Sequence, residues 1–221
     1  MDGFQLSTLV QQTAKFIVDG GVFMYVILVV WGLGIALCFE RFSKLMFRFD
    51  VDGPSFMNEL QRYVLSNDVQ GAIRICSGSN AMLPKVLKSG LKRANLGADQ
   101  IQNAMDATIL EVVPKIEKNI GLLGTLANIS TLFGLLGTIQ GLIMSFSAVA
   151  EADPAQKAEV LAVGISVAMN TTGLGLLSAI SILIFQAFIN MKSDKIVSEI
   201  DEFSAKLIDL LGTKNLKESD L

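Results

Sequence analysis

The sequence predicts an all-α integral membrane protein with three transmembrane helices, two of which extend into a cytoplasmic helical bundle. Composition and its distribution along the chain support this class. The chain of 221 residues is 51% hydrophobic. Only 18% of it is charged, whereas soluble domains carry about 25% charge. The apolar residues are also gathered into three blocks, 20–39, 119–150 and 160–191, which contain no Asp, Glu, Lys or Arg.

The first predicted transmembrane helix covers residues 19–39. Its charge-free part reads GGVFMYVILVVWGLGIALCF, close to the roughly 20 residues that one crossing needs. Residues 1–18 form an amphipathic segment before it. This segment lacks the basic region followed by an apolar region that marks a cleavable signal peptide, so we expect no cleavage here.

Residues 40–118 are predicted to form a cytoplasmic helical domain. Apolar residues recur every three or four positions in SNDVQGAIRICSGS and in MLPKVLKSGLKRANLG, as on one face of a helix. Gly78 and Gly97 are expected to end these two helices. A further helix, residues 99–118, leads into the second apolar block and has Pro114 as a candidate kink.

The second and third apolar blocks are longer than one membrane crossing. At about 1.5 Å per residue, each makes a helix of about 50 Å, against a hydrocarbon core of about 30 Å. We therefore expect long helices over 119–150 and 160–191 that contain transmembrane helices 2 and 3 and continue beyond the membrane. Residues 151–159 form the loop between them, and residues 192–221 form a C-terminal cytoplasmic helix. The apolar face expected for that last helix consists of Ile196, Ile200, Phe203, Leu207 and Leu210.

The basic residues predict the orientation, because cytoplasmic segments next to membrane helices are rich in Lys and Arg. Most of these residues lie in 40–118 and after Met191, whereas the loop 151–159 has Lys157 beside three acidic residues. We therefore expect residues 1–18 and the loop in the periplasm, and the C-terminus in the cytoplasm.

The composition argues against an enzyme. The chain has no histidine, which excludes His-based metal sites and Ser/His/Asp catalysis within it. It has no phosphate-binding glycine motif, and Cys38 and Cys76 are expected to be free thiols. A net charge of -3 gives no reason to expect nucleic acid as a partner. We expect no catalytic residues, no bound metal and no cofactor.

Small residues in the two long blocks predict close helix packing, because small residues let helix backbones approach each other in lipid. Asn170 is also expected to bond a neighbouring helix, since an amide in hydrocarbon is costly without a partner. Polar or small residues lie on several faces of these helices, so we expect an obligate homo-oligomer. The predicted helix-packing or subunit-interface residues are Gly134, Gly137, Gly141, Gly164, Ala168, Asn170, Gly175 and Ala179.

Two motifs, GLLGTIQGLIMSF (134–146) and LAVGISVAMNTTGLGLLSAI (161–180), resemble the MotA/TolQ/ExbB family of ion-driven stator proteins. The layout of one helix, a cytoplasmic insert and two long helices is also similar. Three membrane helices match the ExbB/TolQ-like branch, whereas flagellar members have four. The resemblance implies a location in the bacterial inner membrane.

The resemblance also implies a mechanism. Five subunits form a ring around two copies of a single-span partner of the ExbD/TolR/MotB type, whose intramembrane aspartate carries the ion. Thr138 and Thr172 match threonines that line the ion route, and Thr171 is a further candidate. Ion flow then drives work at a periplasmic load, with TonB-dependent uptake, as in ExbB, preferred over Tol–Pal or gliding motility. A non-conducting oligomeric scaffold is the remaining alternative.

Two departures from the family pattern bear on the ion. Val167 stands where the ExbB/TolQ branch places a membrane glutamate, so the ion's counter-charge is expected from the partner alone. The Thr171–Thr172 pair resembles sodium-type flagellar stators, and hydroxyl oxygens suit a hard cation. We expect H⁺ as the transported ion, with Na⁺ as the alternative.

Overall fold

The computed structural model describes residues 16–18 and 20–219, with side chains as far as Gly212. The prediction for residues 1–18 therefore falls almost wholly outside the described part of the chain. The described residues form helices and connections, and no strand. The elements after the first short turn are α2 (Val22–Lys44), the π-helix η1 (Leu45–Phe49), α3 (Gly53–Leu65), α4 (Val69–Ser77), α5 (Met82–Leu91), α6 (Ala98–Glu117), α7 (Ile120–Glu151) and α8 (Lys157–Ser219).

Three stretches are long and apolar enough to cross a membrane. They lie within Val22–Leu65, Ala98–Glu151 and Lys157–Gly212. Their number and order agree with the three predicted transmembrane helices.

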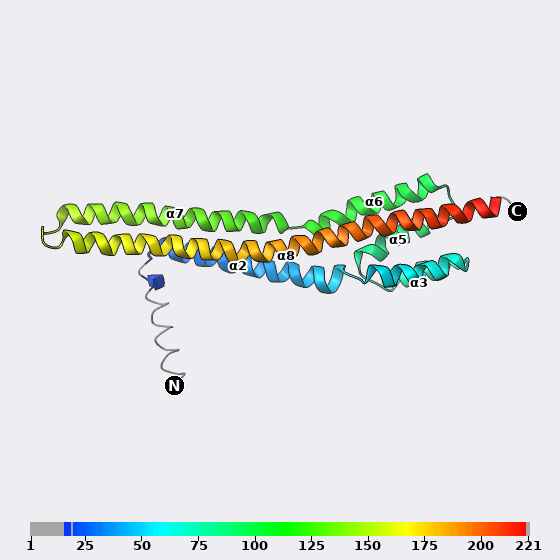
Figure 1. Ribbon diagram of the computed structural model, residues 1–221, viewed down its shortest axis with the longest axis horizontal. Coiled ribbons are helices and arrows are strands. Elements are labelled where there is room, and N and C mark those ends of the chain that lie inside the picture. Colours follow the sequence, from blue (N-terminus) through cyan, green and yellow to red (C-terminus); the bar gives the residue numbers. More distant parts are fainter. Residues whose placement is uncertain (1–15, 19, 220–221) are drawn as a thin grey trace, which may run out of the picture. The chain divides into compact units, whose positions relative to one another are not determined.

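The chain divides into two compact units. The first unit combines the described residues up to Phe39 with Gly121–Ala187, and the second combines Glu40–Ile120 with Phe188–Leu221. In the first unit, α7 and the N-terminal part of α8 lie side by side and run in opposite directions (Figure 1). The short connection 152–156 joins them, inside the predicted loop 151–159.

Helix α2 packs against both α7 and α8 in the first unit. The Trp31 indole N–H donates a hydrogen bond to the Ser181 hydroxyl of α8 over 2.8 Å. The Phe23 and Phe133 rings, on α2 and α7, have centroids 6.4 Å apart. Met24 and Ile27 of α2 are buried, in one apolar cluster with Leu174 of α8. Helix α2 thus covers one flank of the α7–α8 pair.

Helix α8 continues without a break through Met191, where the sequence suggested a membrane helix followed by a C-terminal helix. It is 63 residues long. No glycine or proline occurs between Gly175 and Gly212, so nothing local ends the helix there.

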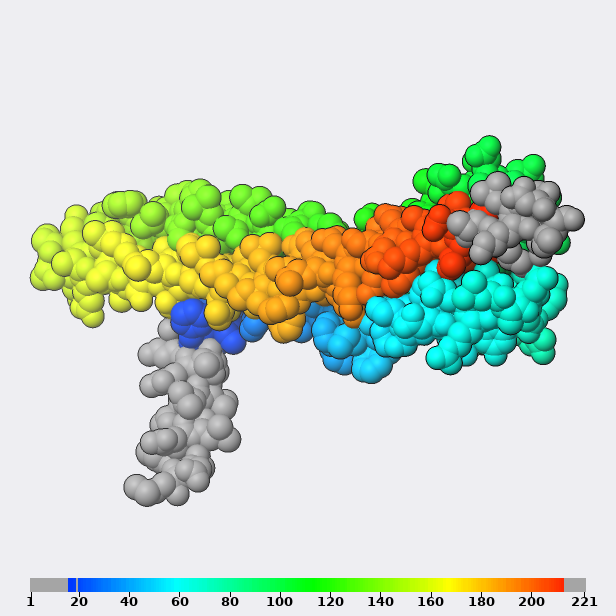
Figure 2. Space-filling view, turned by 45° about the vertical axis from the view of Figure 1, so that its right-hand side comes forward, coloured from blue at the N-terminus to red at the C-terminus, as the bar shows by residue number. Residues whose placement is uncertain are grey.

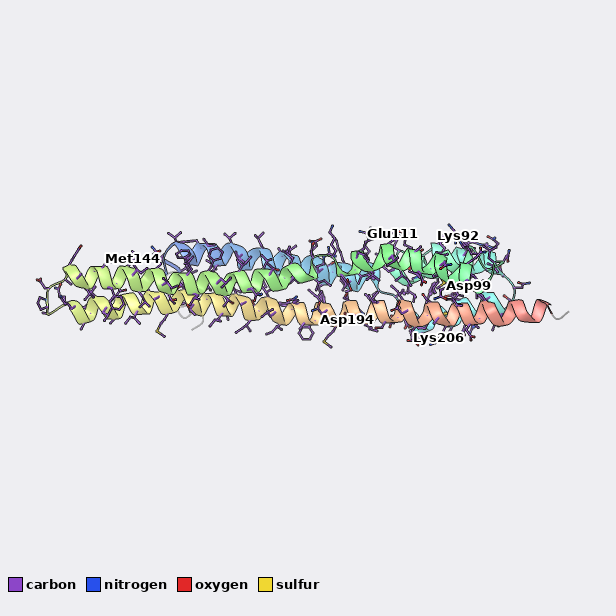
Figure 3. The ribbon with its side chains drawn as sticks, turned by 90° about the horizontal axis from the view of Figure 1, so that it is seen from above. Lys92, Asp99, Glu111, Met144, Asp194 and Lys206 are labelled. Carbon is purple, nitrogen blue, oxygen red and sulfur yellow. The ribbon has the colours of Figure 1, made fainter. Side chains whose placement is uncertain are left out.

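The second unit contains α3 to α6 and the C-terminal part of α8. Helix α3 lies beside α8 (Figure 2), with Gly53 against the Phe203 ring and Asp50 paired with Lys192. Four of the apolar residues expected on one face of the tail are buried here: Ile196, Ile200, Phe203 and Leu207. Glu111, labelled on α6 in Figure 3, pairs with Lys85 of α5 and Lys115 of its own helix.

Helix α6 does not end at Pro114. Helix α6 includes Pro114 and ends at Glu117. The break before α7 comes at Asn119, whose φ is 60°. Asparagine is one of the few residues other than glycine that adopts this left-handed conformation readily, which accounts for the position of the break.

Candidate functional site

Helices α7 and α8 meet along a line of small residues, here called the glycine seam. A Cβ atom on Gly175 would lie 2.8 Å from the Ser130 carbonyl oxygen and 3.0 Å from Gly134 Cα. A Cβ atom on Gly134 would lie 3.2 Å from Thr172 Cα. These neighbours are backbone atoms, so the two backbones are already at close approach. The seam comprises Gly134, Gly137, Gly141 and Ser145 on α7 and Gly164, Ala168, Thr171 and Gly175 on α8.

The seam extends along both helices toward the α7–α8 connection. A Cβ atom on Gly141 would lie 2.9 Å from Ala168 Cβ, and Gly164 packs directly on the Ser145 side chain. Packing within one chain therefore uses the glycines for which the sequence suggested either a helix contact or a subunit interface. Ala179 is also buried.

Asn170 lies outside the seam. It is half-buried, and with its neighbours on α8 it lines a shallow groove on that helix. The other residues along this groove are Ala162, Ile165, Ser166 and Met169. Asn170 therefore lies apart from the candidate ion-route threonines.

The two adjacent threonines of α8 have different surroundings. Thr171 is 1% exposed, and its methyl and hydroxyl pack on Gly137. Its hydroxyl donates to the Ala168 carbonyl over 2.8 Å. Thr172 is half-buried, and its hydroxyl crosses to α7 and donates to the Gly134 carbonyl over 3.0 Å. Thr171 is thus a seam residue, whereas Thr172 is accessible at the edge of the seam.

Thr138 and Thr172 bond to neighbouring peptide carbonyls of α7. The Thr138 hydroxyl donates to the Leu135 carbonyl over 2.6 Å, one residue along from the carbonyl that Thr172 uses. Thr131, one heptad before Thr138, donates to the Ala127 carbonyl over 3.2 Å. The structure therefore places the two candidate route threonines around the same turn of α7.

Both threonines face away from α2. Ser181, which accepts the hydrogen bond from Trp31 of α2, follows Thr172 by nine residues. Nine residues are two and a half helical turns, so the two side chains point to opposite sides of α8. Thr138 follows Phe133, the other α2 contact, by five residues, or about 140°. Helix α2 thus covers one flank of the α7–α8 pair, and the opposite flank carries the threonines. We call Thr131, Thr138 and Thr172 the threonine flank.

The threonine flank offers oxygen atoms but no charge. Each hydroxyl proton is donated to a backbone carbonyl, so the oxygen lone pairs remain to accept a hydrogen bond or to contact a cation. Val167 is half-buried and cannot titrate. Among the described residues, no group of three or more His, Cys, Asp or Glu side chains is arranged to bind a metal. The threonine flank itself therefore carries no charged or titratable acid among the described residues.

The bond between Trp31 and Ser181 was missed by the sequence analysis, although a signal was present. Trp31 is the single tryptophan of the chain and lies in the middle of an apolar helix. A buried indole N–H needs a hydrogen-bond acceptor. A serine hydroxyl in a neighbouring apolar helix can supply that acceptor. The pairing with α8 rather than α7 could not be read from the sequence.

Comparison with known proteins connects this geometry to a family. Residues 78–202 match the model of the "MotA/TolQ/ExbB proton channel family". A "Putative biopolymer transport protein ExbB homolog" of Methanothermobacter thermautotrophicus is 26% identical over 184 residues, covering 83% of this chain and 64% of that protein. A "Putative biopolymer transport protein ExbB-like 1" of Synechocystis sp. is 27% identical over 196 residues, covering 84% of this chain and 72% of that protein.

The fold is also found in a solved structure. The chain resembles one in the "Structure of C. jejuni MotAB" with a TM-score of 0.66 and 13% identity, over 96% of this chain and 90% of that chain. At this identity the likeness concerns the fold alone. The family model covers more than half of the sequence, including the whole seam and both route threonines. The chain is a membrane protein that belongs to the MotA/TolQ/ExbB proton channel family.

Proposed function

We propose that this chain is an energy-transducing stator subunit that couples ion flow through a membrane to mechanical work. The observation that carries the proposal is the threonine flank, which presents hydroxyl oxygens from two helices on the side that α2 leaves open. This flank lies in the charge-free segments 119–150 and 160–191, so it can accept an ion-carrying group without contributing a charge of its own.

In the proposed assembly, several copies of the chain, five by family resemblance, form a ring around a single-span protein of the ExbD/TolR/MotB type. The partner's membrane aspartate supplies the charge, and the threonine flank faces it. A protonated carboxyl group donates a hydrogen bond to a free lone pair of Thr138 or Thr172, which fits H⁺ as the ion. The ring lies in the bacterial inner membrane, with the loop 151–159 periplasmic and the C-terminus cytoplasmic.

The relatives favour an ExbB-like subunit over a TolQ-like or gliding-motility subunit. Two proteins with ExbB in their names align with more than four fifths of this chain. We therefore propose work at the outer membrane or in the periplasm, driven through a TonB-type load.

The proposal is tested by copurification and ion flux. The tagged chain is coexpressed with single-span proteins that contain one membrane aspartate, and stable pairs are reconstituted in liposomes with a pH-sensitive dye. We expect proton uptake with the pair, and loss of uptake with Thr172→Val. Thr125→Val is the control, because the Thr125 hydroxyl bonds only to the Gly121 carbonyl of its own helix and lies on an exposed face of α7. Unchanged flux in Thr172→Val would overturn the hydroxyl-lined route.

The choice between H⁺ and Na⁺ needs a separate measurement. Flux or driven work is compared in sodium-free and sodium-containing buffer at one fixed membrane potential. We expect full activity without sodium. Activity that depends on sodium and is lost in Thr171→Val would assign the ion to the threonine pair instead.

A non-conducting scaffold is the second candidate, favoured by Val167 and by the absence of charge from residues 119–150 and 160–191. It predicts a stable oligomer that binds no single-span partner and conducts no ion. The copurification above separates the two functions directly.

A further inference from the structure

A short stretch of the second unit, Glu40–Phe49, has one packed side and one open side. It contains the last turn of α2 and the π-helix η1. On the packed side, Arg41 is 2% exposed and Leu45 is 1% exposed. The light-blue part of the chain that includes this stretch is at the surface in Figure 2. The open side carries large apolar residues with high exposure: Phe42 (48%), Met46 (48%) and Phe47 (83%).

The same stretch has an excess of positive charge. Its charged residues are Glu40, Arg41, Lys44 and Arg48. Glu40 is neutralised by Lys44, and Asp50, which follows the stretch, is paired with Lys192. Arg48 is exposed and makes no ion pair with any residue that the structure describes. Two of the exposed apolar residues, Met46 and Phe47, therefore lie within one helical turn of an uncompensated guanidinium.

The position along α2 indicates what surrounds this stretch. Lys44, the last residue of α2, follows Val22, its first residue, by 22 residues, or about 33 Å of α-helix at about 1.5 Å per residue. The hydrocarbon core of a bilayer is about 30 Å thick, and about 40–45 Å with its head groups. If α2 crosses the bilayer from its first turn, Glu40–Phe49 reaches the boundary between the acyl chains and the phosphates.

We propose that Glu40–Phe49 is an interfacial segment that binds anionic phospholipid. Phe42, Met46 and Phe47 lie among the upper acyl chains, and Arg48 contacts the lipid phosphate. Apolar side chains next to a free cation match both parts of such a lipid, and neither water nor an apolar protein surface would satisfy both. The lipid-binding proposal depends on α2 crossing the membrane and does not depend on the stator function.

The test uses the full chain in vesicles, with one tryptophan as a depth probe. Trp31→Phe removes the single natural tryptophan, and Phe47→Trp places the probe at the exposed position. Two vesicle preparations have the same mixture of phosphatidylcholine and phosphatidylglycerol, with bromine on the acyl chains of one or the other lipid. We expect bromine on either lipid to quench the fluorescence of the introduced indole, with about fivefold local enrichment of the anionic lipid.

Two further variants in the same background isolate the cation. Arg48→Gln is expected to bring quenching by the two lipids to the same level, and added salt is expected to lower the anionic preference. Lys92→Gln is the matched control, because Lys92 is an exposed cation at the end of α5. It is expected to change nothing.

Three results would overturn the proposal. Emission typical of water from the introduced indole, with no quenching, would place the segment outside the membrane. Blue-shifted emission without quenching would mean that protein, such as a second copy of the chain, covers position 47. Equal quenching by both lipids before the Arg48 change would remove the anionic site. None of these results depends on ion flux, so the stator proposal is judged separately.

Discussion

The two edges of the α7–α8 pair differ in how closely their residues are packed. The glycine seam has no room for one added carbon, since a Cβ on Gly175 would meet backbone atoms at 2.8 Å and 3.0 Å. The threonine flank, by contrast, is open and carries partly accessible hydroxyls. The pair Thr171 and Thr172, adjacent in sequence, is divided between the two. Stability is therefore concentrated on one edge and the proposed ion contact on the other, and changes to each are expected to have separable effects.

Enlarging the seam is expected to have the largest effect on stability. Gly175→Ala forces the two backbones apart and is expected to lower the free energy of unfolding by about 1–3 kcal/mol. Thermal unfolding of the purified protein in detergent measures this. Gly173→Ala is the control, because nothing lies within 4 Å of a Cβ at that position. Equal loss in both variants would contradict the seam contact, because replacing glycine by alanine raises helix propensity and does not by itself destabilise a helix.

A clash with a side chain of the seam is expected to lower stability less than a clash with its backbone, and a second substitution is expected to restore part of the loss. Gly164→Ala places its Cβ on the Ser145 side chain, which donates to the Gly141 carbonyl over 2.6 Å. Ser145 can rotate, so we expect a loss smaller than that of Gly175→Ala. Combining Gly164→Ala with Ser145→Ala is expected to recover part of the loss. A double-mutant cycle that gives simple additivity would contradict the contact.

The two threonines provide the sharpest contrast. Thr171→Val leaves a packed methyl in place of a buried hydroxyl and is expected to change stability while leaving ion flux per folded molecule intact. Thr172→Val is expected to cost about 0.5–1.5 kcal/mol of stability through the lost bond to Gly134, and to stop proton flux. Flux normalised to folded protein separates the cases. The reverse pattern would move the ion route into the seam.

The α2 flank is expected to contribute less. Trp31→Phe keeps most of the aromatic surface but removes the hydrogen bond to Ser181, at a cost of about 0.6 kcal/mol for a typical bond in a membrane. Ser181→Ala is expected to cost a similar amount, and the double variant no more than either. Ion flux is expected to be unchanged, because this flank lies opposite the threonines.

The smallest effect concerns Cys76, in the core of the second unit. Burial raises the pKa of its thiol from 9.0 to about 11. The neutral thiol is thus favoured in the folded protein, and this contribution to stability is complete below pH 9 and is lost as the pH rises toward 11. Peptide-resolved labelling with a maleimide at about pH 8, below both pKa values, is expected to modify Cys76 very slowly until denaturant is added. Rapid labelling of the native protein would show that the core around α4 opens.

The sequence predicted the class and number of the helices because those depend on hydropathy and spacing, which are local. Six of the eight seam residues were predicted as helix-packing or subunit-interface positions, because small residues let helix backbones approach each other, whereas Thr171 was assigned to the ion route. The sequence did not show that Thr171 is buried while Thr172 is accessible, because that depends on the rotation of α8 against α7. The partner of Trp31 likewise follows from a tertiary contact. The uninterrupted length of α8 through Met191 could have been predicted, because no glycine or proline lies between Gly175 and Gly212.

The lack of charge in the two long helices has a consequence for biogenesis. A charged residue at the centre of a membrane helix costs about 2.5–3.5 kcal/mol during insertion. Residues 119–150 and 160–191 carry no such residue, so their insertion does not incur this penalty. In the proposed complex the penalty falls wholly on the partner's aspartate. In that complex we therefore expect the ring to form first. The partner's helix is then inserted next to the threonine flank, where its aspartate is less costly than in lipid.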